Sequence, residues 1–116
     1  MIDLSSYIVE HLSNPQCTAC KLHSSVNVHV CVPTARCRYS APPSTGTPAV
    51  VCVGQNPGYH EDKECLPFIG ASGKLLHEGY IKPSRIHERA TVYITNAVRC
   101  STASRCHFAT CRFHSP

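Results

Sequence analysis

Two short β-branched runs on either side of a helical segment place the strongest constraint on the fold. Residues 49–53 (AVVCV) and 91–95 (TVYIT) have the composition of buried strands. Between them, Ser72 can cap a helix that Pro83 ends. The apolar side of this helix consists of Leu75, Leu76 and Tyr80. The order strand, helix, strand predicts a parallel βαβ unit, with a ligand site beyond the carboxyl ends of both strands.

The rest of the chain has a weaker pattern. Apolar residues at helical spacing predict a short amphipathic helix that stops at Asn14-Pro15 and leads to Cys17. These residues are Ile2, Leu4, Ile8 and Leu12. Residues 23–47 are rich in Ser, Pro and Thr and predict a long irregular connection, with one short strand from Val26 to Val32. We expect a single domain over residues 1–116.

A glycine-proline loop, GQNPG, follows the first strand directly. Gly54 and Gly58 permit a tight turn and Pro57 fixes its direction, so several backbone N–H groups can converge on one anion or one base edge. Taken alone, these residues equally suit an ordinary turn at the end of a strand. They are followed by the pair Glu61-Asp62, by PFIG at 67–70 and by SGKLL at 72–76.

In this order the motifs resemble the uracil-DNA glycosylase superfamily, and in particular its iron–sulfur branch, family 4. That branch has a G-E-x-P-G loop, an E-D pair, a P-F-V-G turn and a G-x-L-L helix. VYITNAVRC at 92–100 is similar to its T-N-x-x-K-C motif, and CTACKL at 17–22 to its opening C-x-x-C-x-L. The resemblance implies an α/β three-layer sandwich around a central parallel sheet. It also implies a DNA-repair enzyme that hydrolyses the N-glycosidic bond of uracil.

The resemblance further implies a pocket for an extruded base. Phe68 would stack on uracil, and Asn96 would read the base edge with one amide donor and one acceptor. Gly54 and Gly58 would shape the loop at the base. By residue type alone, a Phe after Pro is more often a core anchor, and an Asn at a strand end is more often a turn former.

The catalytic loop departs from the pattern of family 4. Gln55 stands at the usual acidic position and Asn56 follows it, so the loop is more similar to the G-I-N-P-G of the mismatch-specific uracil glycosylases. Hydrolysis requires a water held beside a sugar that gains positive charge. Asn56 can place that water but cannot take its proton, so we expect modest turnover. His60, Glu61 and Asp62 lie close enough in sequence to assist, although an acidic pair also suits a helix N-terminus.

Nine cysteines are a high and odd count for this length. The resemblance implies four ligands of a [4Fe–4S] cluster, namely Cys17, Cys20, Cys100 and Cys111. The last interval is shorter than in the family, and Cys106 is the alternative fourth ligand. Zinc is the alternative metal, since His107 adds a ligand, but the second half lacks the paired spacing of zinc ribbons. The packing thiols are expected to be Cys31, Cys37, Cys52 and Cys65.

Positive charge is concentrated in residues 82–116, where Glu88 is the one acidic residue. This asymmetry favours a polyanionic partner such as DNA, with a solvated basic face as the alternative. The expected nucleic-acid contacts are Arg85, Arg89, Arg99, Arg105 and Arg112. The first residues do not form a secretion signal, and no apolar stretch approaches the ~20 residues that cross a bilayer. We expect no membrane association and a reducing intracellular compartment, the cytoplasm or the nucleus.

The iron–sulfur glycosylases also have a later His-containing motif, whereas this sequence ends at His114-Ser115-Pro116. We therefore expect a chain truncated at its C-terminus relative to the family. Two functions remain open. The first is uracil-DNA glycosylase activity. The second is a non-catalytic, metal-stabilised module that serves as a scaffold or subunit in a larger protein or nucleoprotein assembly.

Overall fold

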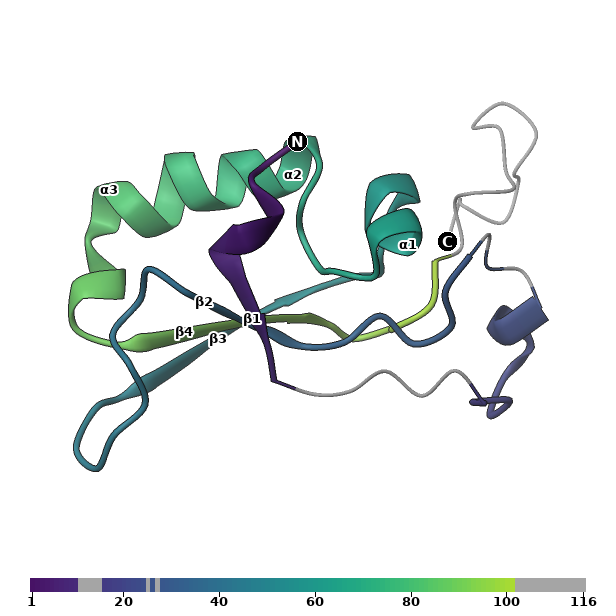
Figure 1. Ribbon diagram of the computed structural model, residues 1–116, viewed down its shortest axis with the longest axis horizontal. Coiled ribbons are helices and arrows are strands. Elements are labelled where there is room, and N and C mark those ends of the chain that lie inside the picture. Colours follow the sequence, from purple (N-terminus) through teal and green to yellow (C-terminus); the bar gives the residue numbers. More distant parts are fainter. Residues whose placement is uncertain (11–15, 25, 27, 102–116) are drawn as a thin grey trace.

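The computed structural model describes residues 1–10, 16–24, 26 and 28–101 of the chain. In this part, four strands form one mixed sheet in the order β1-β2-β4-β3. The strands are β1 (Tyr7–Val9), β2 (Ala35–Cys37), β3 (Ala49–Gly54) and β4 (Thr91–Asn96). Helices α1 (Tyr59–Glu64), α2 (Ala71–Lys74) and α3 (Lys82–Ser84) lie on one side of this sheet (Figure 1). The α/β class is therefore confirmed.

The predicted βαβ unit is present. β3 and β4 pair in parallel from Ala49 opposite Thr91 to Gly54 opposite Asn96. The connection contains α1 (Tyr59–Glu64) and a longer helix made of α2 (Ala71–Lys74), the π-helical η3 (Leu75–Ile81) and α3 (Lys82–Ser84), followed by the 3-10 turn η4 (Ile86–Glu88). Because the two strands are parallel and in register, GQNPG and the residues after Asn96 emerge at the same edge of the sheet.

The sheet is not purely parallel, because β1 pairs with β2 and β2 with β4 in antiparallel fashion. β4 lies inside the sheet, and Val92 and Ile94 are fully buried. β3 is the edge strand of the described sheet, and Val51 and Val53 remain 55% and 61% exposed. The expectation of two buried strands is thus correct for β4 and wrong for β3, whose outer face has no neighbour among the described residues.

The predicted N-terminal helix is wrong over residues 1–10. Asp3 accepts the Ser5 N–H and caps a single 3-10 turn, η1 (Leu4–Ser6), after which the chain forms β1. Tyr7 is 5% exposed and pairs with Cys37 of β2. Tertiary pairing and burial of Tyr7 thus override the helical spacing of the apolar residues. Residues 11–15, including Leu12, lie outside the described residues.

The strand within residues 23–47 lies at a different place from the predicted one. A short 3-10 turn, η2 (Lys21–Ser24), opens this segment, and β2 forms at Ala35–Cys37 rather than at residues 26–32. The backbone N–H groups of Val28 and His29 donate to the Asp62 carboxylate at 3.2 and 2.8 Å. Those donors are therefore unavailable to a sheet, which explains the misplaced strand.

The main helix also begins and ends differently from the prediction. Its N-cap is Gly70, and Ser72 is the second residue of α2 rather than the cap. Pro83 lies within the last helical turn, which ends at Arg85 in the left-handed region with φ 61°. The preceding π-helical turn, with Lys82 N–H bonded to the His77 carbonyl, shifts the hydrogen-bond register before the proline. Within the described residues, no helix is long and apolar enough to cross a membrane.

Candidate base-binding site

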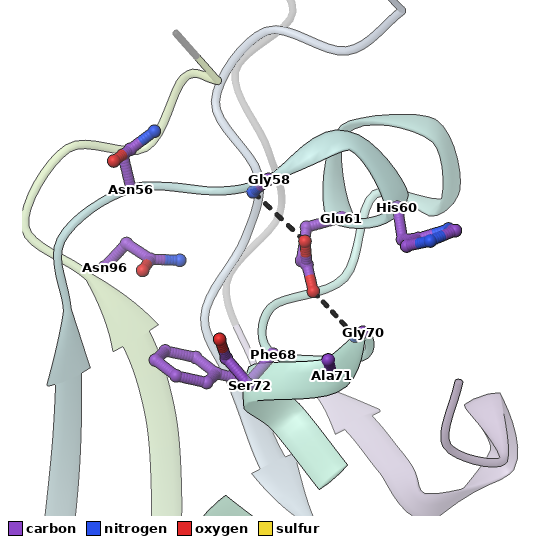
Figure 2. Close-up of a pocket in the computed structure, with 9 residues that line it drawn as sticks. All are labelled: Asn56, Gly58, His60, Glu61, Phe68, Gly70, Ala71, Ser72 and Asn96. Carbon is purple, nitrogen blue, oxygen red and sulfur yellow. Dashed lines mark hydrogen bonds between the residues drawn. The ribbon is translucent and has the colours of Figure 1, made fainter. Parts of the chain in front are cut away.

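A cavity of ≈ 230 Å³ lies where the two parallel strands end (Figure 2). It is smaller than the ~300 Å³ at which pockets for drug-sized ligands begin, so its size suits a single flat base. The residues that line it are Asn56, Gly58, His60, Glu61, Phe68, Gly70, Ala71, Ser72 and Asn96. The loop after β3, the turn before α2 and the end of β4 thus converge on one site.

The predicted stacking and base-reading residues meet in this cavity. Gly54 and Asn96 are paired at the last position of the parallel ladder. A methyl group at Gly54 would overlap the Phe68 ring and approach Asn96 Oδ1 to 2.6 Å, so the ring and the amide both lie against the same glycine. Figure 2 shows both side chains facing the same space. Glycine is required at position 54 because no larger residue leaves room for this arrangement.

A buried carboxylate fixes the two loops that form the cavity. Glu61 is 9% exposed; its Oε1 accepts the Gly58 N–H at 3.0 Å, and its Oε2 accepts the N–H groups of Ile69 and Gly70, each at 2.8 Å. These bonds join the glycine-proline loop to the PFIG turn (Figure 2). Because all three donors are backbone groups, Glu61 holds loop geometry, and its carboxylate is engaged by the protein itself.

The two predicted catalytic residues differ in position. Asn56 lines the cavity, but its side chain points away from Phe68 (Figure 2), and its Nδ2 donates to the Pro57 carbonyl at 3.0 Å. Gln55 is exposed and is not among the cavity residues. The structure thus brings Asn56 to the rim of the pocket and leaves Gln55 outside it.

Three further polar residues near the loop have distinct positions. His60 lines the cavity and packs edge-on against Tyr59. Asp62 is fully buried and faces residues 28 and 29 rather than the cavity. Ser72 lines the cavity, a position that the sequence did not reveal because its residue type suggested a helix cap. A helix that starts after Gly70 has Ser72 in its first turn, next to the PFIG turn. Gly70 as the N-cap is thus the sequence signal that could have placed Ser72 in the site.

Several cysteines lie at the same end of the molecule as the pocket. Cys100, just beyond β4, is buried, and its Sγ accepts the Cys31 N–H at 3.4 Å. Burial raises the pKa of the Cys100 thiol, and the neighbouring thiols of Cys31, Cys20 and Cys17 raise it further. The hydroxyl of Ser101 beside it is buried without a hydrogen-bond partner in the described part of the chain.

This donor set is chemically suited to a thiolate-bound group, since thiols from distant segments are near one another and a backbone N–H is directed at a sulfur. In residues 1–10, 16–24, 26 and 28–101, no three potential ligands are grouped closely enough to hold a metal ion. The predicted fourth ligand Cys111 and its alternative Cys106 lie outside the described residues. Of the expected packing thiols, Cys37 is buried and Cys52 packs against the core, whereas Cys31 lies beside Cys100.

Among the described residues, the predicted DNA-contact arginines do not form one surface. Arg85 and Arg89 flank η4, before β4 begins, and are therefore at the opposite end of the sheet from the pocket. Arg85 is paired with Glu88 at 2.8 Å. Arg99 lies near the pocket end, and its Nε donates to the Val32 carbonyl at 2.8 Å. Arg105 and Arg112 lie outside the described residues.

The fold and the site define an α/β chain with a small cavity where its two parallel strands end, and sequence comparison identifies its family. The pattern of the Uracil DNA glycosylase superfamily matches residues 43–114, more than half of the chain. The chain therefore belongs to the uracil DNA glycosylase superfamily.

Its relatives include three proteins named type-4 uracil-DNA glycosylase. The protein from Thermotoga maritima is 40% identical over 86 residues, which are 73% of this chain and 38% of the relative. The protein from Pyrobaculum aerophilum is 40% identical over 84 residues, 69% of this chain and 41% of the relative. The protein from Sulfurisphaera tokodaii is 48% identical over 65 residues, 54% of this chain and 29% of the relative. The matched region thus spans less than half of each relative. None of these names supports the scaffold alternative.

Proposed function

We propose that this chain recognises uracil in DNA and contributes to hydrolysis of its N-glycosidic bond. The observation that carries the proposal is the placement of the Phe68 ring and the Asn96 amide against Gly54 in a base-sized cavity. The ring supplies a stacking face, and the amide supplies one donor and one acceptor for the edge of an extruded pyrimidine. The relatives' names support uracil as the base.

The catalytic step in this proposal depends on water placement rather than on a general base. Asn56 would hold the attacking water after its side chain turns toward the cavity that it lines. An amide cannot take the proton from that water, so the departing uracil anion must be a good enough leaving group for the bond to break first. Gln55 has an exposed position and serves as the natural comparison.

A uracil-containing oligonucleotide, incubated with the chain and then with alkali, tests the function. We expect strand scission with the wild-type protein and a loss of roughly 10- to 100-fold in Asn96→Ala or Phe68→Ala, from one lost bidentate or stacking contact of about 1–3 kcal/mol. Asn56→Ala should reduce kcat, and Gln55→Ala should not. Equal activity of Asn96→Ala and Gln55→Ala would show that the cavity does not bind the base.

We propose further that a [4Fe–4S] cluster is held by Cys17, Cys20 and Cys100 together with Cys111. The cluster would supply a structural tie between the N-terminal cysteine pair and the end of β4. The all-thiol surroundings of Cys100 support iron–sulfur over zinc. Iron and zinc quantitation with a visible absorption spectrum decides between the two metals.

DNA contact in this proposal is made by the pocket end of the molecule. Arg99 is the described arginine nearest that end, and Arg89 lies beyond the far end of β4. Each lost phosphate contact makes the slope of the logarithm of the binding constant against the logarithm of the salt concentration shallower by about one. We therefore expect Arg99→Gln to weaken DNA binding and reduce this slope, with Arg89→Gln as the matched control. The opposite ranking would place the DNA on the η4 end.

A further inference from the structure

We propose that Tyr7, His77 and Tyr39 are positioning residues that hold the backbone of Phe68 so that its ring is preset for base binding. The inference rests on the proposed function of the cavity and extends it to three residues that do not line it. Tyr7 lies in β1, Tyr39 in the segment after β2 and His77 in η3. The three residues form one hydrogen-bonded chain that ends at the Phe68 carbonyl.

The backbone of Phe68 needs external support. Its φ is 48°, in the left-handed region that a bulky L-residue disfavours. Such a conformation persists only where its surroundings impose it, and these positions concentrate at ligand-binding sites. The same backbone places the ring against Gly54 and beside Asn96, so the conformation of Phe68 determines whether the base platform exists.

Two contacts from the N-terminal segment impose this conformation. The Tyr7 hydroxyl donates to the Phe68 carbonyl at 2.8 Å, and the Ile2 N–H donates to the Ile69 carbonyl at 2.9 Å. The segment before β1 thus lies along the turn that precedes α2 (Figure 1). Gly73 also packs so closely that a methyl group there would overlap the Phe68 carbonyl. The carbonyl is therefore confined by a hydrogen bond and by close packing.

The hydrogen-bond chain has one consistent direction. Because the Tyr7 hydroxyl donates to a carbonyl, its oxygen must accept from His77 Nε2–H, at 2.6 Å. A neutral imidazole protonated at Nε2 accepts at Nδ1, and the Tyr39 hydroxyl lies 2.5 Å from that atom. Tyr39 therefore donates to His77, His77 to Tyr7, and Tyr7 to Phe68. This order fixes the tautomer of His77, which a water-filled cavity would leave undetermined.

Burial makes the chain sensitive to the loss of one member. His77 is 3% and Tyr7 5% exposed. Burial also lowers the pKa of His77 and raises the pKa of both tyrosines, so all three stay neutral near pH 7. A neutral residue that offers both a donor and an acceptor, such as glutamine, can replace the imidazole, whereas an apolar residue removes the donor to the Tyr7 hydroxyl and the acceptor of the Tyr39 hydroxyl.

The carbonyl of Phe68 gives a direct readout. Phe68-Ile69 is the single Phe-Ile pair in the sequence, so carbon-13 carbonyl labelling of Phe with nitrogen-15 labelling of Ile yields one correlated resonance. We expect Tyr7→Phe and His77→Leu to move this carbonyl resonance, and His77→Gln to leave it near its wild-type position. Tyr80→Phe is the matched control, because Tyr80 is 63% exposed.

Kinetics with a uracil-containing oligonucleotide then test the positioning role. Loss of one hydrogen bond corresponds to about fivefold, and because the ring contacts the base before reaction we expect this change mainly in KM for Tyr7→Phe. An unchanged carbonyl resonance in Tyr7→Phe and His77→Leu would overturn the proposal, as would a moved resonance with unchanged KM. Absence of uracil release by the wild-type chain would instead overturn the proposed function. The carbonyl resonance of the variants would still test whether the hydrogen-bond chain positions Phe68.

Discussion

Replacement of Glu61 by glutamine should destabilise the glycine-proline loop and the PFIG turn together, because the carboxylate of Glu61 joins these two segments. It accepts N–H groups from Gly58, Ile69 and Gly70 and is 9% exposed. An amide has one acceptor atom, so at best it keeps the two bonds to Ile69 and Gly70 and turns its NH₂ toward the Gly58 N–H.

The magnitude follows from these three contacts. One hydrogen bond to a charged group is lost, which costs about 1.5–3 kcal/mol, and the other two become neutral and weaken to roughly half. We expect Glu61→Gln to lower the free energy of unfolding by about 3–6 kcal/mol and the midpoint temperature by at least ~10 °C. Glu64→Gln, on the same helix, should change the midpoint little, since Glu64 is partly exposed.

Circular dichroism melts of the wild type and both variants measure this difference, and a uracil-release assay below the melting range measures the site. We expect Glu61→Gln to lose uracil release before it loses helical signal, because the loops that it joins form the cavity. A midpoint for Glu61→Gln within ~2 °C of Glu64→Gln would refute the role of the carboxylate in joining the loops.

Three more predictions concern the core beneath the site. Gly73→Ala should displace the Phe68 turn, because the added methyl meets the Phe68 carbonyl, and a lower midpoint temperature in a melt would verify this. Burial lowers the pKa of His77 below 6.5, so the unfolded chain binds this proton first. The free energy of unfolding should therefore fall as pH drops through about 6.5 and level off below the folded pKa, and the fall should be smaller in His77→Gln by denaturant titration. Burial raises the pKa of Cys37 to about 11, so maleimide at pH 8 should label Cys65, which is partly exposed, before Cys37 by peptide mass spectrometry.

Local sequence predicted the parts of the fold that depend on short-range pattern. The strands at 49–53 and 91–95 were predicted within one residue of β3 and β4, because β-branched runs bounded by glycine and polar residues have few alternatives. The helix between them was predicted as well, and their parallel pairing followed from the connection. Motif order also predicted that Phe68 and Asn96 share a pocket.

Predictions failed where a distant segment provided the partner. The apolar residues near the N-terminus have helical spacing, yet pairing with β2 and burial of Tyr7 make this segment a strand. The strand expected at residues 26–32 lost backbone donors to Asp62, which is more than thirty residues away in the sequence. The burial of β3 was overestimated because composition does not show which strand lies at the edge of a sheet.

The sequence by itself determined which chemical groups this protein has and the loops that carry them, since glycine, proline and β-branched residues act through local sterics. Tertiary structure alone decided that Glu61 joins two loops, that Asn56 points away from the ring, and that a tyrosine of β1 supports Phe68. These contacts link residues far apart in the chain. Hydrogen bonding and burial at such separations depend on how the elements pack, which no local pattern encodes.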